Sequence, residues 1–158
     1  LDFFVHLDFP DAALAFDQKA VQALIPHLRQ AAPRLIFTLH PADYHPDHVA
    51  VSQITQAAAF AAGLPQYSSN GSDWHYDAIL YFSADARTNP GRPALLFDVS
   101  DVIQEKRAAC EAHASQKVTD FALDYAKILG RLAGVAYAEG LYLGQALMIS
   151  KVSGLLKG

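Results

Sequence analysis

The order of apolar and polar positions along the chain predicts strands that alternate with helices. Ala20, Leu24 and Leu28 recur at the spacing of one helical face, which predicts an amphipathic helix over residues 18–31 with Asp17 as its N-cap. The same reasoning predicts strands at 34–39, 76–82 and 94–99, and further helices at 49–62, 102–113 and from residue 120 onward. This alternation favours a single α/β domain over residues 1–158 with a Rossmann-like, mostly parallel sheet flanked by helices.

Local features add smaller predictions to this outline. Apolar and polar residues alternate over residues 1–9, which predicts a strand there. Pro26 predicts a kink within the first helix. Ser100 or Asp101 is the expected N-cap of the third helix. The apolar stretch 141–156 suggests a surface that is buried against a partner, so we expect a homo-oligomer.

Composition and charge exclude several classes of protein. The chain has 158 residues, of which 52% are hydrophobic and 18% charged, so disorder is excluded. Its net charge of −4 argues against binding to nucleic acid or to an anionic membrane. One cysteine, Cys110, allows no internal disulfide, and a reducing, cytoplasmic location is the default. The chain opens on Leu1 and its single methionine is Met148, so we expect an N-terminal portion beyond this sequence.

A histidine-rich stretch that connects the predicted strand 34–39 to the predicted helix 49–62 contains the candidate catalytic residues. It runs Leu-His-Pro-Ala-Asp-Tyr-His-Pro-Asp-His over residues 39–48, and its two prolines stiffen it. His45 and His48 are three residues apart, so both would face the mouth of the sheet if the helix begins near Asp47, and neutral imidazole is a common zinc ligand. Asp43 and Asp47 are both candidates to orient those imidazoles. The alternative interpretation is two exposed polar side chains with no metal.

Other polar residues carry less chemistry. His113 follows a predicted helix end and would bond the last carbonyl groups there. Cys110 fits a small buried hydrophobic residue, because no flanking histidine or basic residue marks it as a nucleophile. Glu139 stands inside an apolar stretch and therefore needs a partner, either as a structural hydrogen-bond hub or as part of the site. The G-x-S-x-G elbow and the common Gly-rich phosphate loops are absent from the sequence.

The motifs taken together resemble one family, the LmbE-like or PIG-L zinc-dependent N-acetylglucosaminyl deacetylases. The His-Pro-Asp-His sequence after a strand is one part of that likeness. The remaining parts are the segments Leu7-Asp8-Phe9-Pro10-Asp11, Asp98-Val99-Ser100-Asp101 with Lys106, His113-Ala114-Ser115-Gln116 and Tyr137-Ala138-Glu139-Gly140-Leu141-Tyr142. They span nearly the whole chain in the order that the family has.

The resemblance implies a function and a role for each loop residue. His48 would be a ligand of Zn²⁺, His45 a protonated imidazole that steadies the tetrahedral oxyanion, and Asp47 the carboxylate partner of His45. Zinc would activate the water that attacks the acetamide of an N-acetylglucosamine-type substrate, and acetate and a free amine would leave. The implied partner is therefore a small amino-sugar molecule.

The sequence departs from the family pattern in one respect. The family's opening strand ends in H-P-D-D-E, which provides two more zinc ligands and the general base, and this motif is absent here. We therefore expect an N-terminally incomplete domain that is inactive as a fragment, with strand edges exposed for oligomerisation. Two alternatives stay open: a non-catalytic carbohydrate-binding or assembly module that has lost the metal, and an amidohydrolase for a larger amide such as a mercapturic conjugate.

Overall fold

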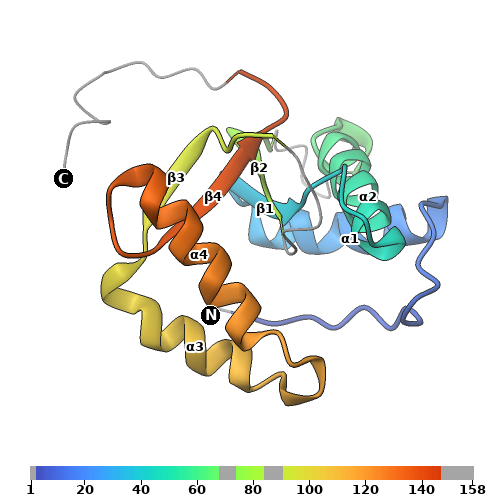
Figure 1. Cartoon of the computed structure of the whole chain (residues 1–158). Coiled ribbons are helices and arrows are strands. Elements are labelled where there is room, and N and C mark those ends of the chain that lie inside the picture. The colour runs from blue at the N-terminus through green and yellow to red at the C-terminus, as the bar shows by residue number, and fades with distance from the viewer. Residues whose placement is uncertain (1–2, 68–73, 84–90, 147–158) are drawn as a thin grey trace.

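The computed structural model describes residues 3–67, 74–83 and 91–146 (Figure 1). Four helices and four strands make up its regular structure. In chain order they are α1 (Gln18–Ala31), β1 (Leu35–Leu39), α2 (Pro46–Ala62), β2 (Ala78–Phe82), β3 (Leu95–Asp98), α3 (Ile103–Glu111), α4 (Thr119–Ala133) and β4 (Ala138–Leu143). Short 3-10 turns lie at Pro65–Tyr67, Ser100–Val102 and Ala114–Gln116. No helix within this described part is both long and apolar enough to cross a bilayer.

The strands form one mixed sheet in the order β1-β2-β4-β3. β1 and β2 are parallel, with Ile36 opposite Ile79, and the helix α2 makes the crossover between them. β4 lies antiparallel to both β2 and β3. The α/β class is confirmed, but the mostly parallel sheet is not, because only one of the three pairings among the described residues is parallel.

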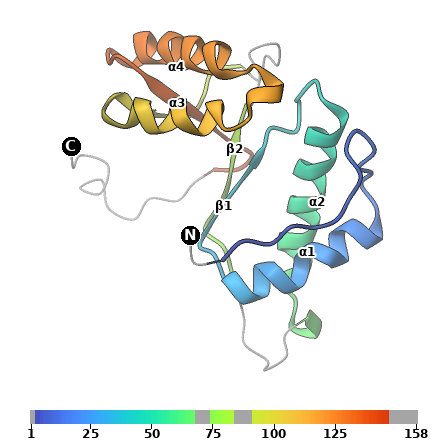
Figure 2. The ribbon, with the colours of Figure 1, turned by 90° about the horizontal axis from the view of Figure 1, so that it is seen from below.

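Two pairs of helices flank the sheet. α1 and α2 pack on each other and α2 packs on β1, whereas α4 packs on β4, on β3 and on α3. Figure 2 shows the two pairs well apart, with β1 and β2 between them. The largest core cluster lies between the first pair and the sheet, and its large members are Ile25, Leu28, Ile36, Trp74, Ile79, Tyr81 and Tyr142.

Most predicted elements are confirmed, and their ends have local causes. α1 has the predicted bounds: the Asp17 carboxylate accepts the Ala20 N–H at 2.8 Å, and the helix continues through Pro26. α2 begins three residues before the predicted start, because Pro46 occupies its first turn and His45 caps it. The strand predicted for residues 1–9 is wrong for residues 3–9, where the chain has no strand, and residues 1–2 lie outside the described part.

The second half of the chain departs further from the prediction. Neither Ser100 nor Asp101 caps the third helix: Ser100 and Asp101 lie in a 3-10 turn, and α3 starts at Ile103 without a side-chain cap. The strand β4 was missed, and it is the strand that joins β2 to β3. Of the apolar stretch 141–156, residues 147–156 lie outside the described part, so the predicted partner surface there stays a prediction.

Candidate functional site

The loop between β1 and α2 is folded by its own hydrogen bonds. His40 donates its backbone N–H to the Phe82 carbonyl at 2.9 Å, which continues the β1–β2 pairing past the end of β1. Its own carbonyl then accepts the Asp43 N–H at 3.0 Å, and its ring Nδ1 accepts the Ala42 N–H at 3.1 Å. The chain therefore turns sharply at the end of the strand and enters α2 in a defined direction.

The two histidines of the predicted site lie together at the start of α2. His45 has extended backbone angles, as a residue before proline should, and its Nδ1 accepts the Asp47 N–H at 3.2 Å as the helix N-cap. The rings of His45 and His48 are stacked, with centroids 4.6 Å apart and planes 27° apart. An acceptor Nδ1 on His45 requires its remaining ring proton to be on Nε2.

The two carboxylates of the loop have different environments. Asp43 is buried, its Oδ1 accepts the His45 N–H at 2.9 Å, and the same oxygen lies 3.2 Å from Nδ1 of His48. Asp47 instead accepts the Leu14 N–H at 3.3 Å and contacts His45 through its backbone. The structure thus places Asp43 against an imidazole and ties Asp47 to the segment before α1. The role of Asp47 as carboxylate partner of His45 stays a prediction.

The donor atoms of this loop suit zinc by type but not by number. Imidazole nitrogen with a carboxylate behind it is a common arrangement around zinc, and Nδ1 of His48 and Oδ2 of Asp43 are buried without a hydrogen-bond partner. Catalytic zinc ordinarily has three protein ligands. The described residues contain no group of three or more histidine, cysteine or acidic side chains placed to hold one ion. His48 fits as one ligand of an incomplete set.

His40 lies on the side of the loop that faces the aromatic core. Its ring meets Tyr142 and Tyr81 edge-on, with centroids 5.0 and 6.0 Å away. Burial lowers the pKa of His40, although the nearby Asp43 carboxylate opposes that shift. Burial also raises the pKa of Tyr142 above its usual range, and the Tyr125 hydroxyl at 3.4 Å adds to the shift. The lowered pKa favours the neutral form of His40, which is partly buried against the two tyrosines.

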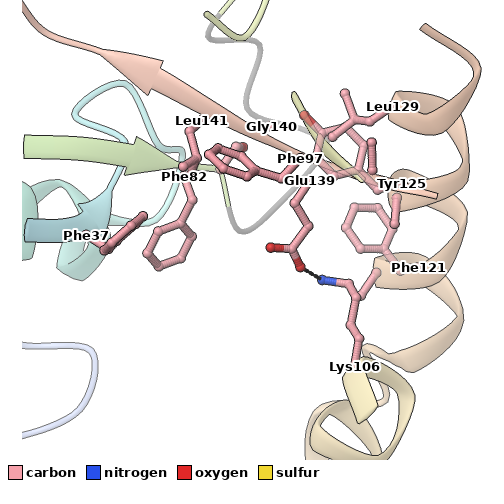
Figure 3. A pocket seen from close by; sticks show the side chains of 14 residues that line it. Phe37, Phe82, Phe97, Lys106, Phe121, Tyr125, Leu129, Glu139, Gly140 and Leu141 are labelled. Carbon is pink, nitrogen blue, oxygen red and sulfur yellow. Dashed lines mark hydrogen bonds and ion pairs between the residues drawn. The ribbon is translucent and has the colours of Figure 1, made fainter. Parts of the chain in front are cut away.

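A separate, open cavity of about 670 Å³ lies between the sheet and α4 (Figure 3). Within it Glu139 of β4 is half exposed and pairs with Lys106 of α3 at 2.5 Å. Glu139 is thus not buried despite its apolar neighbours in the sequence, and Lys106 is the partner that it was expected to need. Aromatic side chains line much of the rest: Phe37, Phe82, Phe97, Phe121 and Tyr125.

The two other candidates from the sequence lie outside both regions. His113 is exposed after α3, and its backbone N–H, not its ring, bonds the Cys110 carbonyl. Cys110 is a free cysteine that is only half buried, so the expectation of a buried position is wrong. The residues alone left Asp43 and Asp47 as equal candidates, and the resemblance assigned a role to Asp47 only. Aspartate often accepts the backbone N–H two residues further on, and this turn preference was the available signal for Asp43.

The chain is similar in sequence to known deacetylases. Residues 1–59 match the family model PIG-L, described as GlcNAc-PI de-N-acetylase. The chain is 26% identical over 150 residues to the diacetylchitobiose deacetylase of Thermococcus kodakarensis, covering 85% of this chain and 54% of that protein. It is 29% identical over 122 residues to the 1D-myo-inositol 2-acetamido-2-deoxy-alpha-D-glucopyranoside deacetylase of Rhodococcus jostii, covering 60% of this chain and 42% of that protein. The chain thus spans about half the length of these curated relatives.

A solved structure extends the likeness to three dimensions. The conserved protein TT1542 from Thermus thermophilus superposes with a TM-score of 0.79 at 29% identity, over 89% of this chain and 65% of that one. The motifs, the family match and the shared fold agree with one another. The resemblance predicted from the sequence is therefore confirmed: the chain is similar to the PIG-L, or LmbE-like, family in sequence and in fold.

Proposed function

We propose that this chain forms part of a zinc-dependent hydrolase that removes the acetyl group from an N-acetylglucosamine-type substrate. The observation that carries the proposal is the pair of stacked imidazoles at the first turn of α2, one of them backed by a buried carboxylate. The two curated relatives are named as deacetylases of acetylated amino sugars, which supports the same reaction class here. The reaction is cleavage of an amide bond that releases acetate and a free amine.

His48 would hold the zinc ion through Nε2. Zinc would supply a Lewis acid that lowers the pKa of water and polarises the acetamide carbonyl. His45 lies beside it and would donate a hydrogen bond from Nε2–H to the oxyanion that forms on the amide carbon. The resemblance gives His45 as protonated, whereas its Nδ1 accepts the Asp47 N–H in this structure. The donating group is Nε2–H in either form, so the proposed role does not depend on a second ring proton.

The zinc site needs further ligands from outside the described residues. Family members carry them on an H-P-D-D-E segment, and one imidazole alone would bind zinc weakly. The absence of a three-ligand group among the described residues favours a second candidate function, a carbohydrate-binding module without a metal. Both candidates share the fold and the sugar, and they differ in whether zinc is bound and whether acetate is released.

The deciding experiment is zinc-dependent acetate release from N-acetylglucosamine derivatives by the complete gene product. The His48→Ala variant should lose both the bound zinc and the activity. A matched control is His75→Ala, which removes an exposed histidine that precedes β2 and lies outside the loop. Equal rates for His48→Ala and the wild-type protein would contradict the assignment of the ligand. Sugar binding without zinc and without acetate release would favour the second candidate.

A further inference from the structure

The carboxylate of Asp43 is held in a fixed place by the backbone around it. The Asp43 N–H donates to the His40 carbonyl, and Oδ1 of Asp43 accepts the His45 N–H at 2.9 Å. This is a compact Asx turn that leads into the cap of α2. The side chain is fully buried and has Nδ1 of His48 at 3.2 Å. The turn therefore sets both the position and the direction of the acid.

Two polar atoms at this contact have no hydrogen bond. Nδ1 of His48 and Oδ2 of Asp43 are both buried, and neither has a hydrogen-bond partner in the described part of the chain. A buried carboxylate oxygen without a partner is costly, and so is a buried ring nitrogen without one. Nδ1 of His48 lies 3.2 Å from Oδ1 of Asp43, so a proton on Nδ1 would lie within donor range of the carboxylate. Each group is the available partner of the other.

We propose that Asp43 is the positioning residue of His48. It accepts a hydrogen bond from Nδ1–H of His48 and thereby leaves the lone pair on Nε2, the nitrogen that would face a metal. The metal side of this inference rests on the proposed function, whereas the position of the ring proton does not. Carboxylates that bond the second nitrogen of a ligand histidine orient the ring and make it a better donor to the metal.

Asp47 is the alternative carboxylate, and its geometry argues against the same role. It precedes His48 directly in α2, and consecutive helical residues point to different sides of the helix. Its Oδ1 is bonded to the Leu14 N–H. Asp43 approaches from the preceding turn, from which a carboxylate does reach the ring. The structure thus divides the two acids between different partners.

The test begins with the ring proton, which needs no metal. Long-range ¹H–¹⁵N NMR at about pH 8, where histidine is ordinarily neutral, identifies which nitrogen of His48 is protonated, with His48→Ala for assignment. We expect the proton on Nδ1 in the wild-type protein and a shift toward Nε2–H in Asp43→Asn. Asparagine still has an oxygen for the His45 N–H, so the turn is preserved. Asp47→Asn should leave the proton in place. A wild-type proton on Nε2, or a proton that moves in Asp47→Asn alone, overturns the inference.

Zinc affinity of the complete gene product, measured by competition with a chromogenic chelator, gives the second readout. Asp43→Asn should weaken binding of Zn²⁺ by about 10–100-fold. The matched control is Asp17→Asn, which removes the same charge from an acid that also accepts a backbone N–H, at 2.8 Å, and should change nothing. If His48→Ala loses zinc while Asp43→Asn binds it as the wild-type protein does, the inference fails and the proposed function stands. If no form binds zinc but the ring proton behaves as expected, the proposed function fails and the role of Asp43 stands.

Discussion

His45 has two roles that a pair of substitutions would separate. Its ring Nδ1 accepts the Asp47 N–H at 3.2 Å and caps α2, and its Nε2–H is proposed to stabilise the oxyanion. His45→Ala removes both. Loss of an N-cap costs about 1 kcal/mol, which corresponds to roughly 2–4 °C in melting temperature for a chain of this size. Loss of one oxyanion donor lowers turnover about 10²–10³-fold, a much larger effect than the loss of stability explains.

His45→Asn keeps the cap and removes the imidazole, because asparagine is among the best N-cap residues. We expect it to restore the free energy of unfolding that His45→Ala loses, as measured by urea denaturation with the fluorescence of the buried Trp74. Acetate release should stay as low as in His45→Ala, while zinc content stays near that of the wild-type protein. Wild-type turnover in His45→Asn would refute the proposed role of the imidazole. A loss of zinc in both variants would show that His45 is itself a ligand.

Two further predictions concern the α4–β4 half of the fold. Gly130→Ala should lower the melting temperature, because the new Cβ would lie 2.7 Å from the backbone oxygen of Ala136. This steric clash should outweigh the better helix propensity of alanine. A higher melting temperature for the variant would contradict the prediction. Ser100→Ala should raise the pKa of the Asp98 carboxyl toward its usual value, because the hydrogen bonds from the Ser100 hydroxyl and N–H lower that pKa. In an NMR titration the Asp98 carboxyl of the variant should therefore become protonated at a higher pH than in the wild-type protein. An unchanged titration curve would contradict the prediction.

Elements whose ends are set by nearby residues were predictable from the sequence. α1 has the predicted bounds because its start and its end are set within a few residues, by the Asp17 cap and by the left-handed Ala32 before Pro33. β1 and β2 are short apolar runs, and both were predicted to within two residues. The loop of residues 39–48 was recognised because its imidazoles, carboxylates and prolines are adjacent in the chain. In each case the interactions that determine the structure connect near neighbours.

Features that depend on distant segments were not predictable in this way. β4 contains Glu139 and Gly140, which are poor signals for a strand, and it is a strand because β2 and β3 pair with its two edges. Glu139 is tolerated there because Lys106, 33 positions earlier, lies opposite it. Residues 3–9 have strand-like composition but pair with no strand in the described part of the chain.

The sequence alone determined which side chains carry the candidate chemistry, and the tertiary structure decided which carboxylate serves which histidine. Asp43 and Asp47 are the same residue type in the same loop, so the residue types alone do not distinguish their roles. The Asp47 carboxylate accepts the N–H of Leu14, which lies 33 positions earlier in the chain. The turn at His40 directs the Asp43 carboxylate toward His48. The physical reason is that a hydrogen bond depends on where two atoms lie in space, and the path of the whole chain sets that position.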